Sequence, residues 1–186
     1  MVPFMSLWLP ILLSAVVVFI ASSIIHIVFT YHQSDFRGLP DEDGIREALK
    51  PFKIPPGDYM IPHANTMKES QTEEYMAKAT QGPVALLTVW KSEPPTLGKS
   101  LAQWFVYSVV VGINAAYIAG AALEPGARYL DVFQFVGTVS FLAYGFALIQ
   151  NSIWNNKSWR ATIYTLIDSF IYALLTAGVF GWLWPA

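Results

Sequence analysis

Four long apolar stretches, separated by polar segments, constrain this chain more than any other feature. They cover Leu7–Thr30, Leu101–Leu123, Val132–Ile149 and Ala161–Trp184. Each is close to the roughly 20 residues that a helix needs to cross a bilayer. Because hydrocarbon cannot satisfy exposed backbone polar groups, we expect all four stretches to be helices. The sequence therefore predicts an integral membrane protein with four spans.

Charged residues are sparse and unevenly placed. They make up 13% of the 186 residues, and most of them lie between Tyr31 and Ser100. Asp168 is the one charged residue inside a predicted span. Since globular domains carry about 25% charged residues, this pattern excludes an ordinary soluble fold.

Cysteine content and net charge exclude several further classes of protein. With no cysteine in the chain, disulfides, thiolate metal sites, iron–sulfur clusters and cysteine nucleophiles are ruled out. A net charge of −2 offers no basic patch for a nucleic acid. The lipid bilayer is the expected partner, and no nucleic acid is.

Lysine and arginine residues near the span ends predict the orientation. The side that carries segments 31–100 and 150–160 offers Arg37, Arg46, Lys91, Lys99, Lys157 and Arg160. The opposite side offers only Arg128. Cytoplasmic loops carry an excess of these residues, so we expect a cytoplasmic segment 31–100 and periplasmic termini in a multi-pass protein.

Segment 31–100 is too long for a bare connection and is expected to form a small α/β insert. The expected elements are a helix between Pro40 and Pro51, a strand over Asp58–Ile61, a helix opened by a capping-box pattern at Ser70–Glu73 and running to about Gln81, and a strand over Val84–Trp90. A module of roughly 50 residues is marginal alone. We therefore expect its apolar strand to pack against the helix ends or against a partner.

These observations predict an all-α membrane fold, a bundle of four transmembrane helices with a small cytoplasmic α/β insert between the first two. The expected divisions are a first transmembrane helix at 1–30, the insert at 31–100 and the remaining three helices at 101–186. The first span has no Lys or Arg before it, so we expect a retained helix and not a cleaved signal peptide.

Tests for nucleotide and metal sites are negative. Gly98-Lys99-Ser100 resembles the end of a phosphate-binding loop, but the glycine required five residues earlier is Glu93. His26 and His32 are six residues apart, which predicts different helix faces, and His63 lies in a proline-rich loop. No cofactor and no metal site are expected.

No short hydrolase motif is present, so no catalytic residue is predicted. The chain is expected to be non-enzymatic, with a membrane enzyme lacking such motifs as a third alternative.

Asp168 is the most unusual residue of the predicted spans, because inserting a carboxylate into the membrane costs about 2.5–3.5 kcal/mol on insertion scales. His26 is expected at a similar depth from the cytoplasmic edge and could pair with it. Tyr164 and Tyr172, four residues to either side, share its helix face and can offer hydroxyls. Two interpretations stay open, a buried carboxyl that fixes helix packing and a protonatable relay or ion site.

Small residues form two rows at helical spacing, which lets helix backbones approach closely. The second span has Ser108, Gly112, Ala116 and Gly120, and the fourth has Ala173, Ala177 and Gly181. Asn114 could bond Ser140 at a similar depth on the third helix. These rows either pack the bundle internally or pair with another subunit.

Several segments resemble a family of small bacterial membrane proteins to which no activity is assigned. The resemblance rests on Trp8–Leu13, Ile24–His26, Asp35–Asp43, Ile54–Met60 and Tyr172–Pro185. It covers the whole chain and implies a bacterial inner membrane, but it implies no activity.

The expected function is that of a non-enzymatic accessory or scaffolding subunit of a membrane complex. A protein partner would bind the cytoplasmic insert or the small-residue helix faces. The alternative is a proton- or ion-coupled transport component that uses Asp168 with His26.

Overall fold

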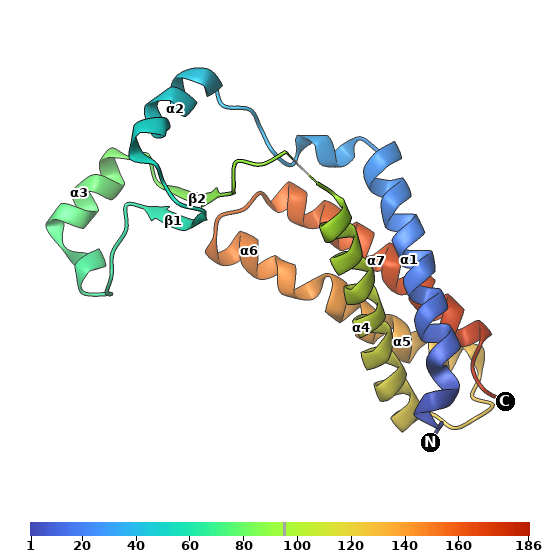
Figure 1. The fold of residues 1–186 in the computed structure, drawn as a ribbon. Helices are drawn as coiled ribbons and strands as arrows, with labels where there is room; N and C mark the ends of the chain where they lie inside the picture. The colour runs from blue at the N-terminus through green and yellow to red at the C-terminus, as the bar shows by residue number, and fades with distance from the viewer. Residues whose placement is uncertain (95) are drawn as a thin grey trace. The chain divides into compact units, whose positions relative to one another are not determined.

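The computed structural model describes residues 1–94 and 96–186 and is mostly helical, with one small sheet. It divides into two compact units (Figure 1). The helical unit contains Met1–Arg37 and Thr96–Ala186, and the insert unit contains Gly38–Pro95. Residues 31–37 and 96–100, which we assigned to the insert, thus belong to the helical unit.

Four helical segments of the helical unit are long and apolar enough to cross a membrane, as predicted. Their helices are α1 (Trp8–Val28), α4 (Gly98–Ala122), α5 (Tyr129–Tyr144) continued by α6 (Ile149–Trp154), and α7 (Trp159–Trp182). The ends differ from the expected ones by a few residues. A short 3-10 turn, η1 (Phe4–Leu7), precedes α1.

The third segment is interrupted, which the sequence did not predict. Helix α5 ends at Tyr144, and the 3-10 turn η5 (Phe146–Leu148) separates it from α6. Gly145 lies at the break, so close to α7 that an added Cβ would lie 2.8 Å from the Cβ of Ser169. The break thus coincides with a very close approach between α5 and α7.

Helix α7 packs against α5 and α1, while α4 packs against α1 and α5. The core between them is built largely from small and β-branched residues. Its buried members include Leu7, Ile11, Ala115, Ala116, Ala119, Val132, Val136, Ala177 and Phe180. Close packing of this kind holds helices together where lipid removes the hydrophobic driving force.

Both chain ends lie at the same end of the helical unit (Figure 1). The backbone N–H of Val2 donates to the carbonyl of Gly120 at 2.9 Å, and that of Gly126 donates to the carbonyl of Pro185 at 2.8 Å. The last turn of α4 and the short α4–α5 connection therefore lie against the two termini. If the four segments span a membrane, both termini lie on the same side of it.

The insert unit has the predicted order of helix, strand, helix and strand. Its elements are α2 (Glu42–Leu49), η3 (Lys50–Phe52), β1 (Gly57–Ile61), η4 (Glu69–Gln71), α3 (Glu73–Gln81) and β2 (Ala85–Val89). The strands pair antiparallel, with Tyr59 opposite Leu87. The expected capping box at Ser70 is wrong, because Thr72 is the N-cap of α3 and its hydroxyl accepts from the Tyr75 N–H.

Candidate functional site

The candidate site lies where α1 ends and the chain folds back onto α7. Helix α1 stops at Val28, and Phe29 is extended, with φ −88° and ψ 133°. The following 3-10 turn, η2 (Tyr31–Ser34), packs against α7. This fold-back directs Tyr31 and His32 toward Asp168.

Asp168 is buried, with 3% of its side chain exposed, and two groups from η2 bond it. The Tyr31 hydroxyl donates to Oδ1 of Asp168. His32 Nε2 lies 2.6 Å from Oδ2 of the same carboxylate, and His32 Nδ1 lies 2.6 Å from Oδ2 of Asp35. One imidazole thus connects two carboxylates.

His26, in the last two turns of α1, completes the group. Its ring centroid lies 4.7 Å from that of His32. One potential ligand atom each from His26, His32 and Asp168 lie within 4.8 Å of one another. We call His26, Tyr31, His32, Asp35 and Asp168 the polar cluster.

The interpretation that placed His26 and His32 on different helix faces is wrong. It assumed a continuous helix through residue 32, whereas α1 ends at Val28, Phe29 is extended and η2 packs against α7. His32 is also no plain surface residue, since only 20% of its side chain is exposed. The structure does bring His26 close to Asp168, although the direct bonds to Asp168 come from Tyr31 and His32.

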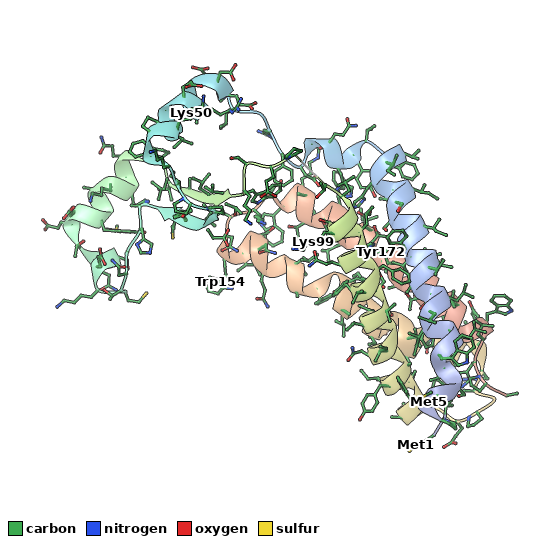
Figure 2. The ribbon with its side chains drawn as sticks, viewed as in Figure 1. Met1, Met5, Lys50, Lys99, Trp154 and Tyr172 are labelled. Carbon is green, nitrogen blue, oxygen red and sulfur yellow. The ribbon has the colours of Figure 1, made fainter. Side chains whose placement is uncertain are left out.

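The two tyrosines expected to serve Asp168 do not bond it. The Tyr164 hydroxyl accepts a hydrogen bond from Arg160 Nε at 3.2 Å, and its ring packs edge-on against Tyr31. Tyr172 packs among the helices against Trp104 (Figure 2). In the described part of the chain, the buried Tyr172 hydroxyl has no hydrogen-bond partner.

Tyr31, Asp35 and His32 are the site residues that sequence reasoning missed. In the sequence, Tyr31 lies just beyond the first apolar stretch and His32 is six residues from His26, and neither position indicates a contact with Asp168. The only local signal is the β-branched Thr30 after Phe29, which is a weak helix breaker. Their role depends on the contact of η2 with α7, more than 120 residues away in sequence.

The two carboxylates set the electrostatics around η2. Burial alone would lower the pKa of His32 and is the largest single influence, but hydrogen bonds and charge from Asp35 and Asp168 outweigh it and raise the pKa. Burial, together with the bond to Asp168, also raises the pKa of Tyr31. Within residues 1–94 and 96–186, neither Asp35 nor Asp168 forms an ion pair with Lys or Arg.

A cavity of about 310 Å³ borders the polar cluster at Asp35. It is lined by Ser34, Asp35, Arg37, Ser158 and Arg160. Asp35 thus both lines this cavity and bonds His32, which bonds Asp168. Of the polar cluster, Asp35 is the member that lines this cavity.

The small-residue rows pack against other helices of the same chain. Ser108, Gly112, Ala116 and Gly120 are buried in α4, where Gly112 faces Ile11 and Gly120 faces Leu7 of the N-terminal segment. In α7, Ala173 and Ala177 are buried, Ala177 lies against Gly137 of α5, and Gly181 lies against the ring of Tyr129. These rows pack α4 against α1, and α7 against α5.

The expected bond between Asn114 and Ser140 is absent from the described residues. Asn114 is exposed, and its side-chain amide donates to the carbonyl of Val110 in its own helix at 2.8 Å. The Ser140 hydroxyl is buried without a partner there. Asn114 is therefore not part of the contact between α4 and α5.

The insert unit presents a second candidate site, an exposed apolar surface on its sheet. Met60 pairs with Leu86 on the face of the sheet that also carries the pair Asp58 and Thr88. Val84 and Trp90 flank β2 at its two ends. All four are exposed, Leu86 at 57% and Trp90 at 81%. We call Met60, Val84, Leu86 and Trp90 the apolar strip.

No residue in the described range 38–94 is buried. The more protected residues, such as Tyr59 and Leu87, lie on the other face of the sheet and are only half-buried. A two-stranded sheet needs a packed hydrophobic face for stability. The insert unit therefore has apolar surface available for contact and very little core of its own.

Comparison of the chain with protein-family models, with curated proteins and with solved structures finds no match. The resemblance to small bacterial membrane proteins accordingly stays a prediction.

Proposed function

We propose that this chain is a multi-pass membrane protein that serves as an accessory or scaffolding subunit of a membrane complex. The observation that carries the proposal is the apolar strip on an insert unit whose described residues include none that is buried. Exposed apolar surface on a small unit is typical of a protein–protein contact. The insert unit is the surface that binds the partner.

The helix faces are weaker candidates for that contact. The small-residue rows that could have paired with another subunit already face α1 and α5 within the chain. The apolar strip is therefore the stronger candidate for the contact surface, because its apolar side chains are exposed. It also favours intramolecular packing as the role of Gly112 and Gly120.

The charge of the insert unit favours a protein partner over an anionic lipid surface. Segment 38–95 contains nine acidic and six basic side chains, a net charge of −3. The cytoplasmic leaflet is negative and attracts basic segments. An acidic module with an exposed Trp90 and Leu86 fits a partner with apolar surface and basic surroundings.

The test is co-purification of the full-length protein in mild detergent, with mass spectrometry of what accompanies it. We expect one partner in a fixed ratio to the wild-type chain, and loss of that partner from a Leu86→Ser, Trp90→Ser variant. The matched control is Met67→Ser, which changes another exposed apolar residue of the insert unit outside the apolar strip. Purification of the wild-type chain alone, or equal recovery of the partner with all variants, would contradict the proposal.

We further propose that the membrane is a bacterial inner membrane, with the insert in the cytoplasm and both termini in the periplasm. The distribution of Lys and Arg supports the orientation. The packing of both termini against the α4–α5 connection supports their location on one side.

A second candidate function is ion-coupled transport that uses Asp168 with His26. It is favoured by the buried carboxylate within α7 and by the connection through His32 and Asp35 to a cavity. Intramembrane ionisable residues that line such routes mark ion pathways in membrane proteins.

Reconstituted vesicles distinguish the two functions. A transport component loses ion flux in the Asp168→Asn variant while its folded helix content is unchanged. Flux equal to that of empty vesicles, or flux unaffected by Asp168→Asn, would contradict transport and leave the partner-binding proposal standing.

A further inference from the structure

We propose that His26, His32 and Asp168 form a binding site for a divalent transition-metal ion of the zinc class. The site is separate from the apolar strip, so the inference goes beyond the proposed partner-binding function. It rests on the ligand geometry, the groups that orient the ligands, and the charge of the cluster.

The three side chains form a compact ligand set. One donor atom from each lies within 4.8 Å of the others. Zinc bonds histidine nitrogen and carboxylate oxygen at about 2.0–2.2 Å, which places neighbouring ligand atoms on a tetrahedral ion about 3.4 Å apart. His32 Nε2 and Asp168 Oδ2, which are 2.6 Å apart, would have to separate by about 0.8 Å to bind one ion.

The ligands are oriented by second groups in the way that metal sites require. Metal-bound histidines almost always donate their other ring N–H to a carboxylate, a carbonyl or water. His32 bonds Asp35 through Nδ1, which leaves Nε2 directed at Asp168. The Tyr31 hydroxyl occupies Oδ1 of Asp168 and leaves Oδ2 for the ion.

The charge of the cluster favours a cation. Asp35 and Asp168 share a single imidazole, and their ion pairs within residues 1–94 and 96–186 involve only His32. An ion that binds His32 Nε2 and Asp168 Oδ2 displaces any proton that these two atoms share, and that proton leaves to solvent. Metal binding of this type releases protons because the ligands bind deprotonated.

The donor types select the class of ion. Two imidazole nitrogens and one carboxylate oxygen suit zinc, cobalt or ferrous iron, whereas magnesium and calcium prefer all-oxygen sites. Of the three ligands, His26 is the exposed one. Because the ligands come from α1, η2 and α7, the ion would hold the end of α1 against α7.

The test is a Co²⁺ titration of the full-length protein, purified through a tag without histidine, treated with a chelator and followed by visible absorption. We expect the d–d bands of one low-symmetry Co²⁺ per chain, displaced by one equivalent of Zn²⁺ and unaffected by excess Mg²⁺. Wild-type protein that shows no such bands would overturn the proposal, whatever the variants do.

Variants assign the ligands. His32→Ala and His26→Ala should each abolish saturable binding, while Asp35→Asn should weaken it about 10–100-fold, as expected for an orienting group. His63→Ala, which removes the remaining histidine from the insert unit, is the matched control and should bind like wild type.

Size-exclusion profiles and helix content show which variants are folded. A folded His26→Ala or His32→Ala variant that binds Co²⁺ as tightly as the wild type would contradict the assignment.

Discussion

Tyr31 and Tyr172 carry the same hydroxyl in different surroundings. The Tyr31 hydroxyl donates to Asp168, whereas that of Tyr172 is buried without a partner in the described residues. A hydrogen bond to a charged group contributes about 1.5–3 kcal/mol, and a buried unpaired polar group is a cost. We expect Tyr31→Phe to lower the free energy of unfolding by about 1.5–3 kcal/mol, and Tyr172→Phe to leave it unchanged or raise it.

Reversible unfolding in mixed micelles, monitored by circular dichroism, measures both variants. Each substitution removes one oxygen from a tyrosine near the same carboxylate, so each serves as the control for the other. Equal losses of stability in the two variants would show that the bond to Asp168 is not a stabilising contact.

Single residues were predicted unevenly from the sequence. Asp168 stood out because it is the one charge in an apolar stretch, and His26 because it shares its depth. Tyr31 and His32, which bond Asp168, could not be identified, since their positions depend on the end of α1 at Val28 and on the extended Phe29. Sequence spacing alone does not show where a helix ends, so the helical period was applied to residues that follow α1.

At the scale of elements, α5 and α7 pack closely, and two glycines at this contact differ in the space around them. An added Cβ at Gly145 would lie 2.8 Å from Ser169 Cβ, whereas one at Gly137 would lie 3.4 Å from Ala177 Cβ. We expect Gly145→Ala to lower the free energy of unfolding by about 1–3 kcal/mol through overpacking. Gly137→Ala should be neutral or stabilising, because alanine favours the helix by about 1 kcal/mol over glycine.

The same unfolding measurement compares the two variants, and Gly137→Ala controls for the general effect of a methyl group on α5. If Gly145→Ala proves as stable as Gly137→Ala, the close approach of α5 to α7 is not a constraint on stability.

The elements themselves were largely predictable. Hydropathy located the four long helical segments, and turn residues located the two helices and two strands of the insert, because both signals are local. The break at Gly145 was not predictable, since it coincides with a contact to Ser169 in another helix. The capping residue of α3 was missed because η4 extends the loop to Thr72.

For the whole molecule, the absence of cysteine makes the orientation directly testable. Single cysteines at Ser70 in the insert unit and at Gly126 in the α4–α5 connection report opposite sides of the membrane. We expect a membrane-impermeant maleimide to label intact cells, with the outer membrane permeabilised, only at position 126. Position 70 should react after lysis, as cytoplasmic loops do when they follow the positive-inside rule.

Labelling of position 70 before lysis would invert the proposed topology. A cysteine at Ala186, in the chain terminus, should behave like position 126 and is the internal control for the location of the termini.

The partner-binding role of the insert is the central claim, and hydrogen–deuterium exchange of β1 and β2 tests it most directly. Amides of a unit with little core open readily and exchange fast, whereas docking on a partner protects them. We predict strong protection of Gly57–Ile61 and Ala85–Val89 in native membranes and its loss in lipid nanodiscs that contain the chain separated from its partner, with α4 protected in both. Equal exchange of the two strands in both preparations would contradict the claim, because the insert would then contact no partner beyond its own chain and lipid.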